Sequence, residues 1–423
     1  MRPRAFAGLV AVVAALAVPG AAMAERPAAP GLGRAAAAIL VDARDGSVIV
    51  QKNPDARRAM ASATKLMTAL LALERARPDD VFTAPPYSAL PVESKINLRT
   101  GERMRLDDLL EALLLESAND AAVTIAEGVG GSRAAFVRAM NERARALGLD
   151  GTSYANPIGL DDPDNYSTAR DLATLARRLL RHERFAAVVD MPSAVLESGA
   201  RRRVVANRND LVARYPFVAG VKTGHTREAG HVLVGAAAAR SGARVVSVVL
   251  GEPGESARDA DTVALLRYGL AQFRRVKALD ARRVVATASV EHRDERARLQ
   301  PARDVVVLAR RGERIGRRVA APETLEGELA PRTRVGRVAV LRGGRVVARV
   351  PLVTAAEVPG AGPLRVIVDE LGFLLTLLLL VVIVSLVAIA GSRLRARRAR
   401  DQAERRRATA GSEARAGEPG PTT

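Results

Sequence analysis

The chain of 423 residues has 48% hydrophobic and 26% charged residues, a composition that predicts two or three folded domains and excludes wholesale disorder. It contains no cysteine, which excludes disulfides, zinc ribbons, iron–sulfur clusters and thiol catalysis, and its four scattered histidines predict no metal site. The formal net charge of +19 indicates an anionic partner or surface, whereas the absence of tryptophan and the 3% aromatic content argue against a nucleic-acid partner.

The N-terminal segment has the pattern of a secretory signal peptide. Arg2 and Arg4 precede an apolar run over residues 7–18, and Ala22-Met23-Ala24 forms a small-x-small cleavage site. We therefore expect residues 1–24 to direct export and to be removed after Ala24. The alternative is an uncleaved N-terminal anchor.

Residues 25–277 are predicted to form one α+β domain. Asp45-Gly46 lies between two short apolar runs and predicts a hairpin. Strands are expected first and last, with helices between them, which favours an α+β layout over repeating βαβ units. The expected strands cover residues 38–41, 47–50, 218–222, 232–239 and 245–250, and the expected helices cover residues 64–75, 106–128, 133–147, 168–181 and 256–274.

Residues 278–358 are predicted to form a small all-β domain, because short runs alternate valine with arginine and are broken by glycine and proline. Between residues 280 and 350 there are 17 arginines and nine acidic residues, a net charge of +8. Two interpretations stay open: a solvated basic surface, or a contact with an anionic wall polymer or lipid. The expected strands cover residues 284–285, 305–308, 335–341 and 346–353, with a hairpin turn at 342–345.

The C-terminal part is predicted to cross a membrane. Residues 359–370 form a linker, and residues 371–390 are an uninterrupted apolar run of 20 residues, long enough as a helix for about 30 Å of hydrocarbon. Five arginines follow within residues 393–400, so the positive-inside rule puts the basic tail 391–423 in the cytoplasm and everything before residue 371 outside. We expect this tail to be disordered. Its arginines act as a stop-transfer signal or hold anionic lipid.

The first of three short motifs is S-A-T-K at residues 62–65, where a helical run begins. Lys65 lies three positions after Ser62 and therefore on the same helix face. A serine hydroxyl needs a base to become a nucleophile, and a lysine can be that base only when it is neutral. The free N–H groups at a helix start would lower the pKa of the lysine or hold an oxyanion. By itself the motif is better explained as a serine helix cap beside a surface lysine.

The second motif is Ser117-Ala118-Asn119, which offers a hydroxyl to relay a proton and an amide to hold a substrate carbonyl. The third is Lys222-Thr223-Gly224, at the end of an extended segment, where a cation and a hydroxyl could bind a carboxylate. Gly224 would let a substrate backbone approach, and the N–H of His225 could be an oxyanion donor beside that of Ser62. Taken singly, Ser117-Ala118-Asn119 is better explained as an ordinary helix–helix turn.

The lysine inventory adds an independent argument. The chain has only five lysines against 60 arginines, and two of the five, Lys65 and Lys222, fall inside the motifs. Arginine cannot be deprotonated in a protein, whereas a buried lysine can. A lysine in such an arginine-rich chain therefore indicates a position where arginine would fail.

S-x-x-K, S-x-N and K-T-G in this order resemble the signature set of penicillin-binding proteins and serine β-lactamases. The flanking words ASATKLMTA, LLLESANDAA and GVKTGHTREAG are similar to those of the low-molecular-weight D-alanyl-D-alanine carboxypeptidases, and the resemblance covers residues 35–274. It implies a β-lactamase/transpeptidase-like domain with an antiparallel sheet flanked by helices. It also implies peptidoglycan stem peptides as substrates, β-lactams as inhibitors, and no cofactor.

The resemblance also assigns roles residue by residue. Ser62 would be the acyl-ester nucleophile, Lys65 its proton acceptor and Ser117 a proton shuttle. The remaining positions would bind substrate: Asn119, Arg208, Lys222, Thr223, Gly224 and His225.

Two positions depart from the family pattern. Asn165 stands where the family often has histidine, and Ala219 where aspartate is common. We expect neither to touch the chemistry.

The sequence therefore predicts an exported, membrane-anchored serine carboxypeptidase that removes the terminal D-alanine from pentapeptide stems. Enzymatic alternatives are a serine β-lactamase, which would need faster deacylation, and an endopeptidase that cuts cross-links. A non-enzymatic alternative is a tethered wall-binding or sensing protein with a degenerate site.

Overall fold

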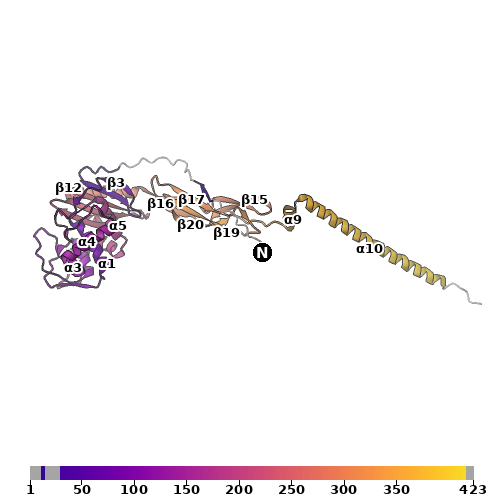
Figure 1. Cartoon of the computed structure of the whole chain (residues 1–423), viewed down its shortest axis with the longest axis horizontal. Coiled ribbons are helices and arrows are strands. Elements are labelled where there is room, and N and C mark those ends of the chain that lie inside the picture. Colours follow the sequence, from indigo (N-terminus) through magenta and orange to yellow (C-terminus); the bar gives the residue numbers. More distant parts are fainter. Residues whose placement is uncertain (1–10, 15–28, 416–423) are drawn as a thin grey trace, which may run out of the picture. The chain divides into compact units, whose positions relative to one another are not determined.

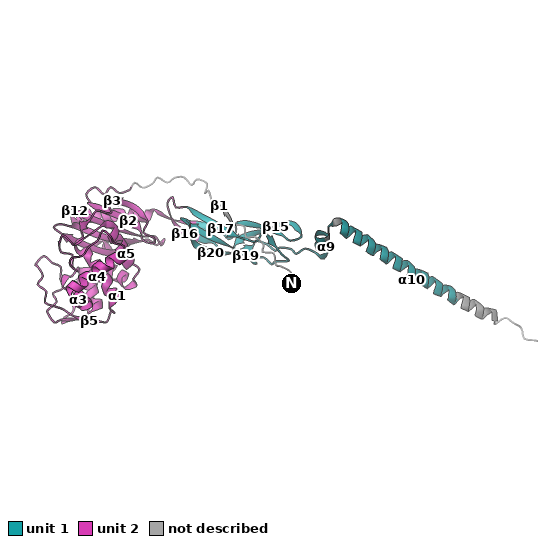
Figure 2. Ribbon diagram, in the orientation of Figure 1, with its two compact units in different colours: residues 1–16, 277–305, 314–423 teal, residues 17–276, 306–313 magenta. Residues whose placement is uncertain are grey.

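The computed structural model describes residues 11–14 and 29–415 (Figure 1). Its internal contacts divide the chain into two units, coloured separately in Figure 2. We call residues 17–276 with 306–313 the mixed unit, and residues 1–16, 277–305 and 314–423 the β unit.

The mixed unit is built on a five-stranded antiparallel sheet in the order β10-β11-β12-β2-β3. The predicted hairpin at Asp45-Gly46 joins β2 to β3, and Gly46 takes the positive φ of 80° that such a turn needs. The strands are β2 (Ala37–Asp42), β3 (Val48–Lys52), β10 (Val218–Thr226), β11 (Gly230–Ala238) and β12 (Arg244–Glu252).

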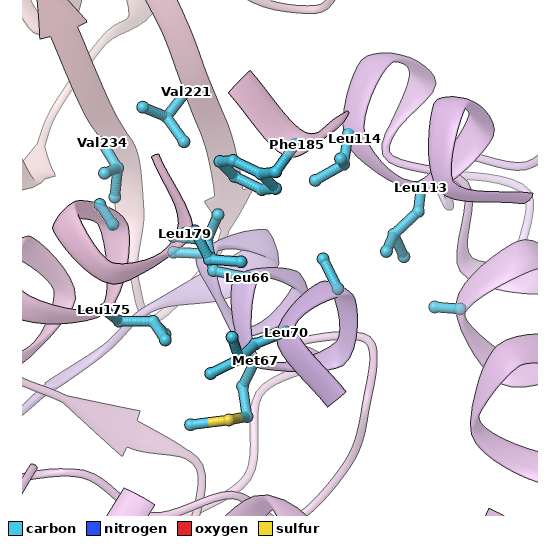
Figure 3. Close-up of a cluster of buried hydrophobic side chains, with 14 of the residues drawn as sticks. Leu66, Met67, Leu70, Leu113, Leu114, Leu175, Leu179, Phe185, Val221 and Val234 are labelled. Atoms are coloured by element: carbon cyan, nitrogen blue, oxygen red, sulfur yellow. The ribbon is translucent and has the colours of Figure 1, made fainter. Parts of the chain in front are cut away.

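Both faces of this sheet are buried. In β2, Ile39 and Val41 join the core shared with the helices, whereas Ala38 and Leu40 join a second core on the other face. Successive side chains of a strand point to opposite faces, so a run with no polar position predicts burial on both sides. Figure 3 shows the first core, where side chains from α1, α5 and η2 meet those of β10 and β11.

Two helices of the mixed unit begin at a side-chain cap that the sequence supplies. Thr168 accepts a hydrogen bond from the N–H of Asp171 at the start of α5, and Ser132 does the same for Ala135 in α4. The elements are η1 (Ala61–Thr64), α1 (Lys65–Arg75), α2 (Leu106–Glu111), η2 (Ala112–Glu116), α3 (Asn119–Gly130), α4 (Arg133–Ala146), α5 (Ala169–Leu179), α6 (Glu183–Val189), α7 (Leu211–Arg214) and α8 (Glu255–Ala271). Short strands pair in twos: β4 (Arg58–Ala59) with β7 (Tyr166–Ser167), β5 (Val81–Thr83) with β6 (Arg103–Arg105), and β8 (Ser193–Leu196) with β9 (Arg203–Ala206).

The prediction of one helix over residues 106–128 is wrong. The segment is α2, a π-helical stretch η2 and α3, separated at Ser117, which has a left-handed φ of 63°. The apolar residues run through all three pieces, so periodicity alone could not reveal the break.

The β unit contains a seven-stranded sheet in the order β1-β17-β19-β20-β15-β14-β18. The hairpin predicted at residues 342–345 is present, with positive φ at Gly343 and Gly344. The strands are β1 (Ala11–Ala14), β14 (Ala286–Val290), β15 (Arg293–Pro301), β17 (Ile315–Ala320), β18 (Thr324–Leu325), β19 (Arg334–Arg342) and β20 (Arg345–Thr354). The sequence did not predict β15 or β17, because arginine masks their alternation.

Two segments differ from the predicted layout. β13 (Phe273–Leu279) pairs with β16 (Val305–Arg310), so a strand begins where the sequence predicted the last helix to end. Residues 306–313 belong to the mixed unit, where Arg310 Nη1 donates to the carbonyl of Val48 at 3.1 Å, although the sequence placed them in the β domain.

The predicted signal peptide lies mostly outside the described residues. Its described part, β1, pairs antiparallel with β17. Removal of residues 1–24 remains a prediction, and it would leave β17 as an edge strand.

Two helices end the described chain. α9 (Pro363–Leu371) precedes α10 (Phe373–Arg415), and Gly372 between them has a φ of 77°. Leu374 and the apolar side chains that follow it are exposed along α10, which is long and apolar enough to cross a membrane.

The sequence predicted a disordered tail after residue 390, but in the structure residues 391–415 are helical, because α10 continues to Arg415. Alanine, arginine and glutamate, all strong helix formers, dominate this stretch, and it contains no proline.

Candidate active site

Ser62 and Lys65 meet as the spacing predicts. Ser62 lies in η1 and Lys65 is the first residue of α1, and Lys65 Nζ is 3.0 Å from Ser62 Oγ. The lysine side chain is fully buried, and its Nζ also donates to the carbonyl oxygen of Ile158 at 2.5 Å. The amine is therefore held between the serine hydroxyl and a backbone acceptor.

The loop around Ile158 is shaped to present that carbonyl. Asn156 Oδ1 accepts hydrogen bonds from the N–H groups of Gly159 at 2.7 Å and Leu160 at 3.2 Å, which folds the chain back on itself. Gly159 has a φ of 90°, and a Cβ there would lie 2.0 Å from the carbonyl oxygen of Ala61. Only glycine allows the loop to pack so closely against η1.

Burial lowers the pKa of Lys65 well below its ordinary value, since the charged form loses its hydration, and the positive charge of Lys222 lowers it further. The negative charge of Glu93 acts in the opposite direction. The surroundings of Lys65 therefore favour the neutral amine that a general base requires.

The second motif lies beside the break between η2 and α3. Ser117 and Asn119 are both buried, and the N–H of Asn119 donates to the carbonyl of Ser94 at 2.8 Å. The carboxamide Nδ2 of Asn119 donates to Glu93 Oε2 at 2.6 Å. Because α1 packs against both η2 and α3, this turn faces the helix that carries Lys65.

The third motif lies on β10, the edge strand of the sheet. A Cβ on Gly224 would lie 2.9 Å from the backbone nitrogen of Ser62, so the glycine lets the strand approach the serine. The sequence predicted Gly224 to make room for a substrate backbone, and in the structure it makes room for η1. β10 packs directly on η1, which places the K-T-G strand beside the Ser62–Lys65 pair.

Lys222 is buried like Lys65. Its Nζ donates to the carbonyl of Thr223 at 3.1 Å, and burial together with the charge of Arg208 lowers its pKa to about 7. The charge of Glu116 raises it. A bound carboxylate would stabilise the protonated form, so Lys222 is suited to recognise an anionic group.

Arg208 and His225 are at the rim of the site. Arg208 donates through Nη2 to Glu116 Oε1 at 2.5 Å, and its N–H donates to the carbonyl of Leu115. The exposed His225 ring stacks on His231 with centroids 4.2 Å apart. These contacts tie Arg208 to η2, from where its charge acts on Lys222, and they pack the His225 ring of β10 on the facing residue of β11.

Several partners in the site were not predicted from the sequence. Glu93 and Tyr87 belong to the irregular segment between β5 and β6, and Ile158 contributes only its backbone carbonyl. No periodicity or family word in the sequence indicates these positions. Asn165, which was expected not to touch the chemistry, donates to the hydroxyl of Thr64 at 3.3 Å and so contacts the first motif.

An antiparallel sheet covered on both faces, with a serine–lysine pair against its edge strand, defines the transpeptidase-like class of serine enzymes to which penicillin-binding proteins belong. The family model of the S11 peptidases, described as D-alanyl-D-alanine carboxypeptidase, matches residues 23–254. The chain belongs to this family.

Individual relatives agree with this assignment. The chain is 29% identical over 338 residues to the D-alanyl-D-alanine carboxypeptidase DacF of Bacillus subtilis, covering 78% of this chain and 87% of the relative. It is 30% identical over 347 residues to DacA of Escherichia coli, covering 78% and 85%. The crystal structure of penicillin binding protein 5 from Haemophilus influenzae superposes with a TM-score of 0.57 at 28% identity, covering 79% of this chain and all of that chain.

Proposed function

We propose that this chain is a membrane-anchored serine D-alanyl-D-alanine carboxypeptidase that trims the terminal D-alanine from peptidoglycan pentapeptide stems. The observation that carries the proposal is the buried Lys65 amine, 3.0 Å from Ser62 Oγ and beside the K-T-G strand. The family assignment supports the same reaction.

Acylation begins when neutral Lys65 takes the proton of Ser62 and the serine oxygen attacks the carbonyl carbon of the penultimate D-alanine. The N–H groups of Ser62 and His225 stabilise the oxyanion, and Ser117 relays the proton to the leaving amine. The C–N bond breaks, D-alanine leaves, and the peptide remains as an ester of Ser62. Water then attacks the ester, which releases the shortened stem and restores the serine hydroxyl.

Substrate binding falls to residues at the edge strand and the rim. Protonated Lys222 and Thr223 bind the terminal carboxylate of the stem, with Arg208 adding positive charge nearby. Asn119 holds a peptide carbonyl, and Gly224 keeps the strand close to Ser62. The same groups would bind the carboxylate and carbonyl of a β-lactam.

Replacing Ser62 with alanine tests the nucleophile. We expect Ser62→Ala to lose all covalent labelling by fluorescent penicillin while its melting temperature stays that of the wild type. Intact mass and peptide mapping of the wild-type adduct should place the penicilloyl group on the peptide that contains Ser62. An adduct on Ser62→Ala would refute the assignment, and a wild type that never acylates would favour a degenerate site. Release of D-alanine, measured beside penicillin turnover and cleavage of dimeric muropeptides, separates the carboxypeptidase from the β-lactamase and endopeptidase alternatives.

We further propose that the mixed unit and the part of the β unit before α10 lie outside the cell, and that the residues after the apolar part of α10 lie in the cytoplasm. The arginine cluster at residues 393–400 supports this orientation. Because the chain has no native cysteine, single cysteines report sidedness directly. A membrane-impermeant maleimide should label Ser241→Cys in intact cells and Ser412→Cys only after permeabilisation. Equal labelling of both before permeabilisation would contradict this topology.

We also propose that one face of the β unit binds a phosphate- or carboxylate-rich polymer. Arg298, Arg337 and Arg349 each stand beside a buried core position of their strands, and Arg318 stands beside Val319, which packs against the hydrophobic core of this unit. Their register puts the four arginines on the opposite face of the sheet. Among the described residues none of the four has an acidic partner within 4 Å. Retention on an anionic polymer resin should fall with salt, and Arg318→Ala with Arg349→Ala should weaken it without altering penicillin labelling. Retention equal to that of the wild type would contradict the proposal.

A further inference from the structure

Glu93 is a carboxylate in the active site that none of the three motifs contains. Its Oε2 accepts hydrogen bonds from the hydroxyl of Tyr87 and from Asn119 Nδ2, and its Oε1 accepts one from the N–H of Leu90 at 2.9 Å. Three donors on two different segments therefore converge on one side chain. A carboxylate so fully hydrogen-bonded is held rigidly.

The contact with Glu93 determines how the Asn119 amide is turned. An ionised carboxylate can only accept hydrogen bonds, so the NH₂ end of the carboxamide must face Glu93. The oxygen of the carboxamide must then point to the opposite side. The backbone of Asn119 is also fixed, because its N–H donates to the carbonyl of Ser94, the residue after Glu93. One short stretch of chain thus holds both the main chain and the side chain of Asn119.

The negative charge of Glu93 also acts on the Lys65 amine. The charged groups that act on Lys65 come from two other segments of the chain. Lys222 on β10 opposes its protonation, and Glu93 in the irregular segment between β5 and β6 favours it. Burial raises the pKa of Glu93, but its hydrogen bonds from Tyr87, Asn119 and Leu90, together with the charge of Lys65, lower it overall. Glu93 is therefore ionised at neutral pH. Asp120 is the other carboxylate nearby, and it acts on Tyr87.

We infer that Glu93 is a positioning residue of the acylation step: its carboxylate orients the Asn119 carboxamide and supplies a negative charge to the surroundings of Lys65. This inference rests on the proposed function, because it assigns a purpose to Glu93 within that site. It adds a residue outside S-x-x-K, S-x-N and K-T-G to the acylation machinery.

The inference predicts two separate effects of Glu93→Gln, measured as the second-order rate of acylation by penicillin from pH 5 to pH 10. The acid limb, which is the part of the profile where the rate rises with pH as Lys65 becomes neutral, should move to lower pH. The reason is that the variant loses the charge that raises the pKa of Lys65. The maximal rate should fall by about 10-fold or more, because Asn119 loses its fixed orientation. The limb governed by Lys222 should not move, since Glu93 is not among the charges acting on that lysine.

Matched variants separate charge from shape. Glu93→Asp keeps the negative charge but withdraws it by one methylene, so the acid limb should stay near that of the wild type while the maximal rate falls. Tyr87→Phe keeps the carboxylate and should leave the acid limb in place. Glu74→Gln makes the same chemical change at the far end of α1, where Glu74 pairs with Arg143, and should reproduce the wild-type profile.

An acid limb of Glu93→Gln that coincides with that of the wild type would overturn the electrostatic part of the inference. A maximal rate of Glu93→Asp equal to that of the wild type would overturn the positioning part. If Glu93→Gln does not fold, as judged by its melting temperature, Glu93→Ala, which also removes the charge, decides the electrostatic part, and Glu93→Asp decides the positioning part. A wild type that does not acylate at any pH refutes the proposed function instead, so the two failures are distinguishable.

Discussion

The two units of this protein treat charged side chains in opposite ways. The mixed unit buries Lys65, Lys222 and Arg203 in its interior. In the described residues of the β unit no lysine, arginine, aspartate or glutamate is buried, although this unit is rich in arginine. A buried charged group interacts strongly with neighbouring charges, so its pKa can shift and the group can act as an acid or a base. An exposed charge is screened by water and salt. The reactive groups of this protein are therefore expected where charged side chains are buried, and not where charged side chains are most numerous.

Lys65→Arg should have the largest effect, because it leaves a charge in the site and removes the proposed base. Arginine cannot be neutral in a protein, so we expect acylation by penicillin to fall by about 10³-fold. Stopped-flow or gel-based acylation rates measure the loss. A rate within a few fold of the wild type would show that Lys65 is not the base.

Glu102→Gln should cost stability, because it leaves the guanidinium of Arg203 buried without its partner. The two side chains are almost fully buried and lie 2.8 Å apart. Breaking such a pair costs about 3–5 kcal/mol, measured as the free energy of unfolding in urea. Arg202→Ala is the matched control, because it breaks the exposed Arg202–Glu197 pair, and it should cost less than about 1 kcal/mol. Equal losses in the two variants would contradict the importance of burial.

The same buried pair makes a prediction about pH. Burial alone would raise the pKa of Glu102, but the hydrogen bonds from Arg203 and from backbone N–H groups lower it to about 2 in the folded protein. A carboxyl whose pKa is lowered by folding stabilises above its unfolded value of 4.5 and loses that contribution as the pH falls toward 2. The wild type should therefore lose stability over this interval, and Glu102→Gln should lose less of it.

A matched pair of glycine substitutions, one in each unit, compares a crowded backbone position with an open one, and the crowded position should show an effect of intermediate size. Gly224→Ala would place a Cβ 2.9 Å from the backbone nitrogen of Ser62, so β10 or η1 must move. We expect acylation to slow by about 10-fold or more, with a loss of about 1–3 kcal/mol in stability. Gly316→Ala in β17 of the β unit meets Leu341 only at 3.9 Å and should leave both acylation and stability almost unchanged. Equal effects of the two substitutions would contradict the close approach at Gly224.

The smallest expected effect is a pH dependence of substrate binding. Lys222, with a pKa of about 7, is protonated below that pH and neutral above it. If Lys222 binds the stem carboxylate as proposed, the peptide needs the protonated form, and KM should rise by about fivefold between pH 7 and pH 8. In Lys222→Arg the positive charge persists, and this rise should vanish. A KM that stays constant in the wild type would contradict the role of Lys222.

The sequence shows the three motifs directly. It also predicted the strand-helix-strand layout and the apolar span, because each of these depends on residues close together in the chain. The three motifs carried the candidate site, and the rarity of lysine pointed to Lys65 and Lys222 without reference to any relative. The break at Ser117 and the strands β15 and β17 could not be predicted, because local patterns there fit another structure equally well.

The side chains available for acyl transfer, and roughly where most secondary-structure elements begin, follow from the local sequence. The surroundings of those side chains depend on the fold. Lys65 receives its backbone acceptor from Ile158, 93 residues away, and Asn119 receives its carboxylate from Glu93, 26 residues away. A lysine becomes a base through burial and through charges brought close by folding, and those depend on contacts between distant parts of the chain.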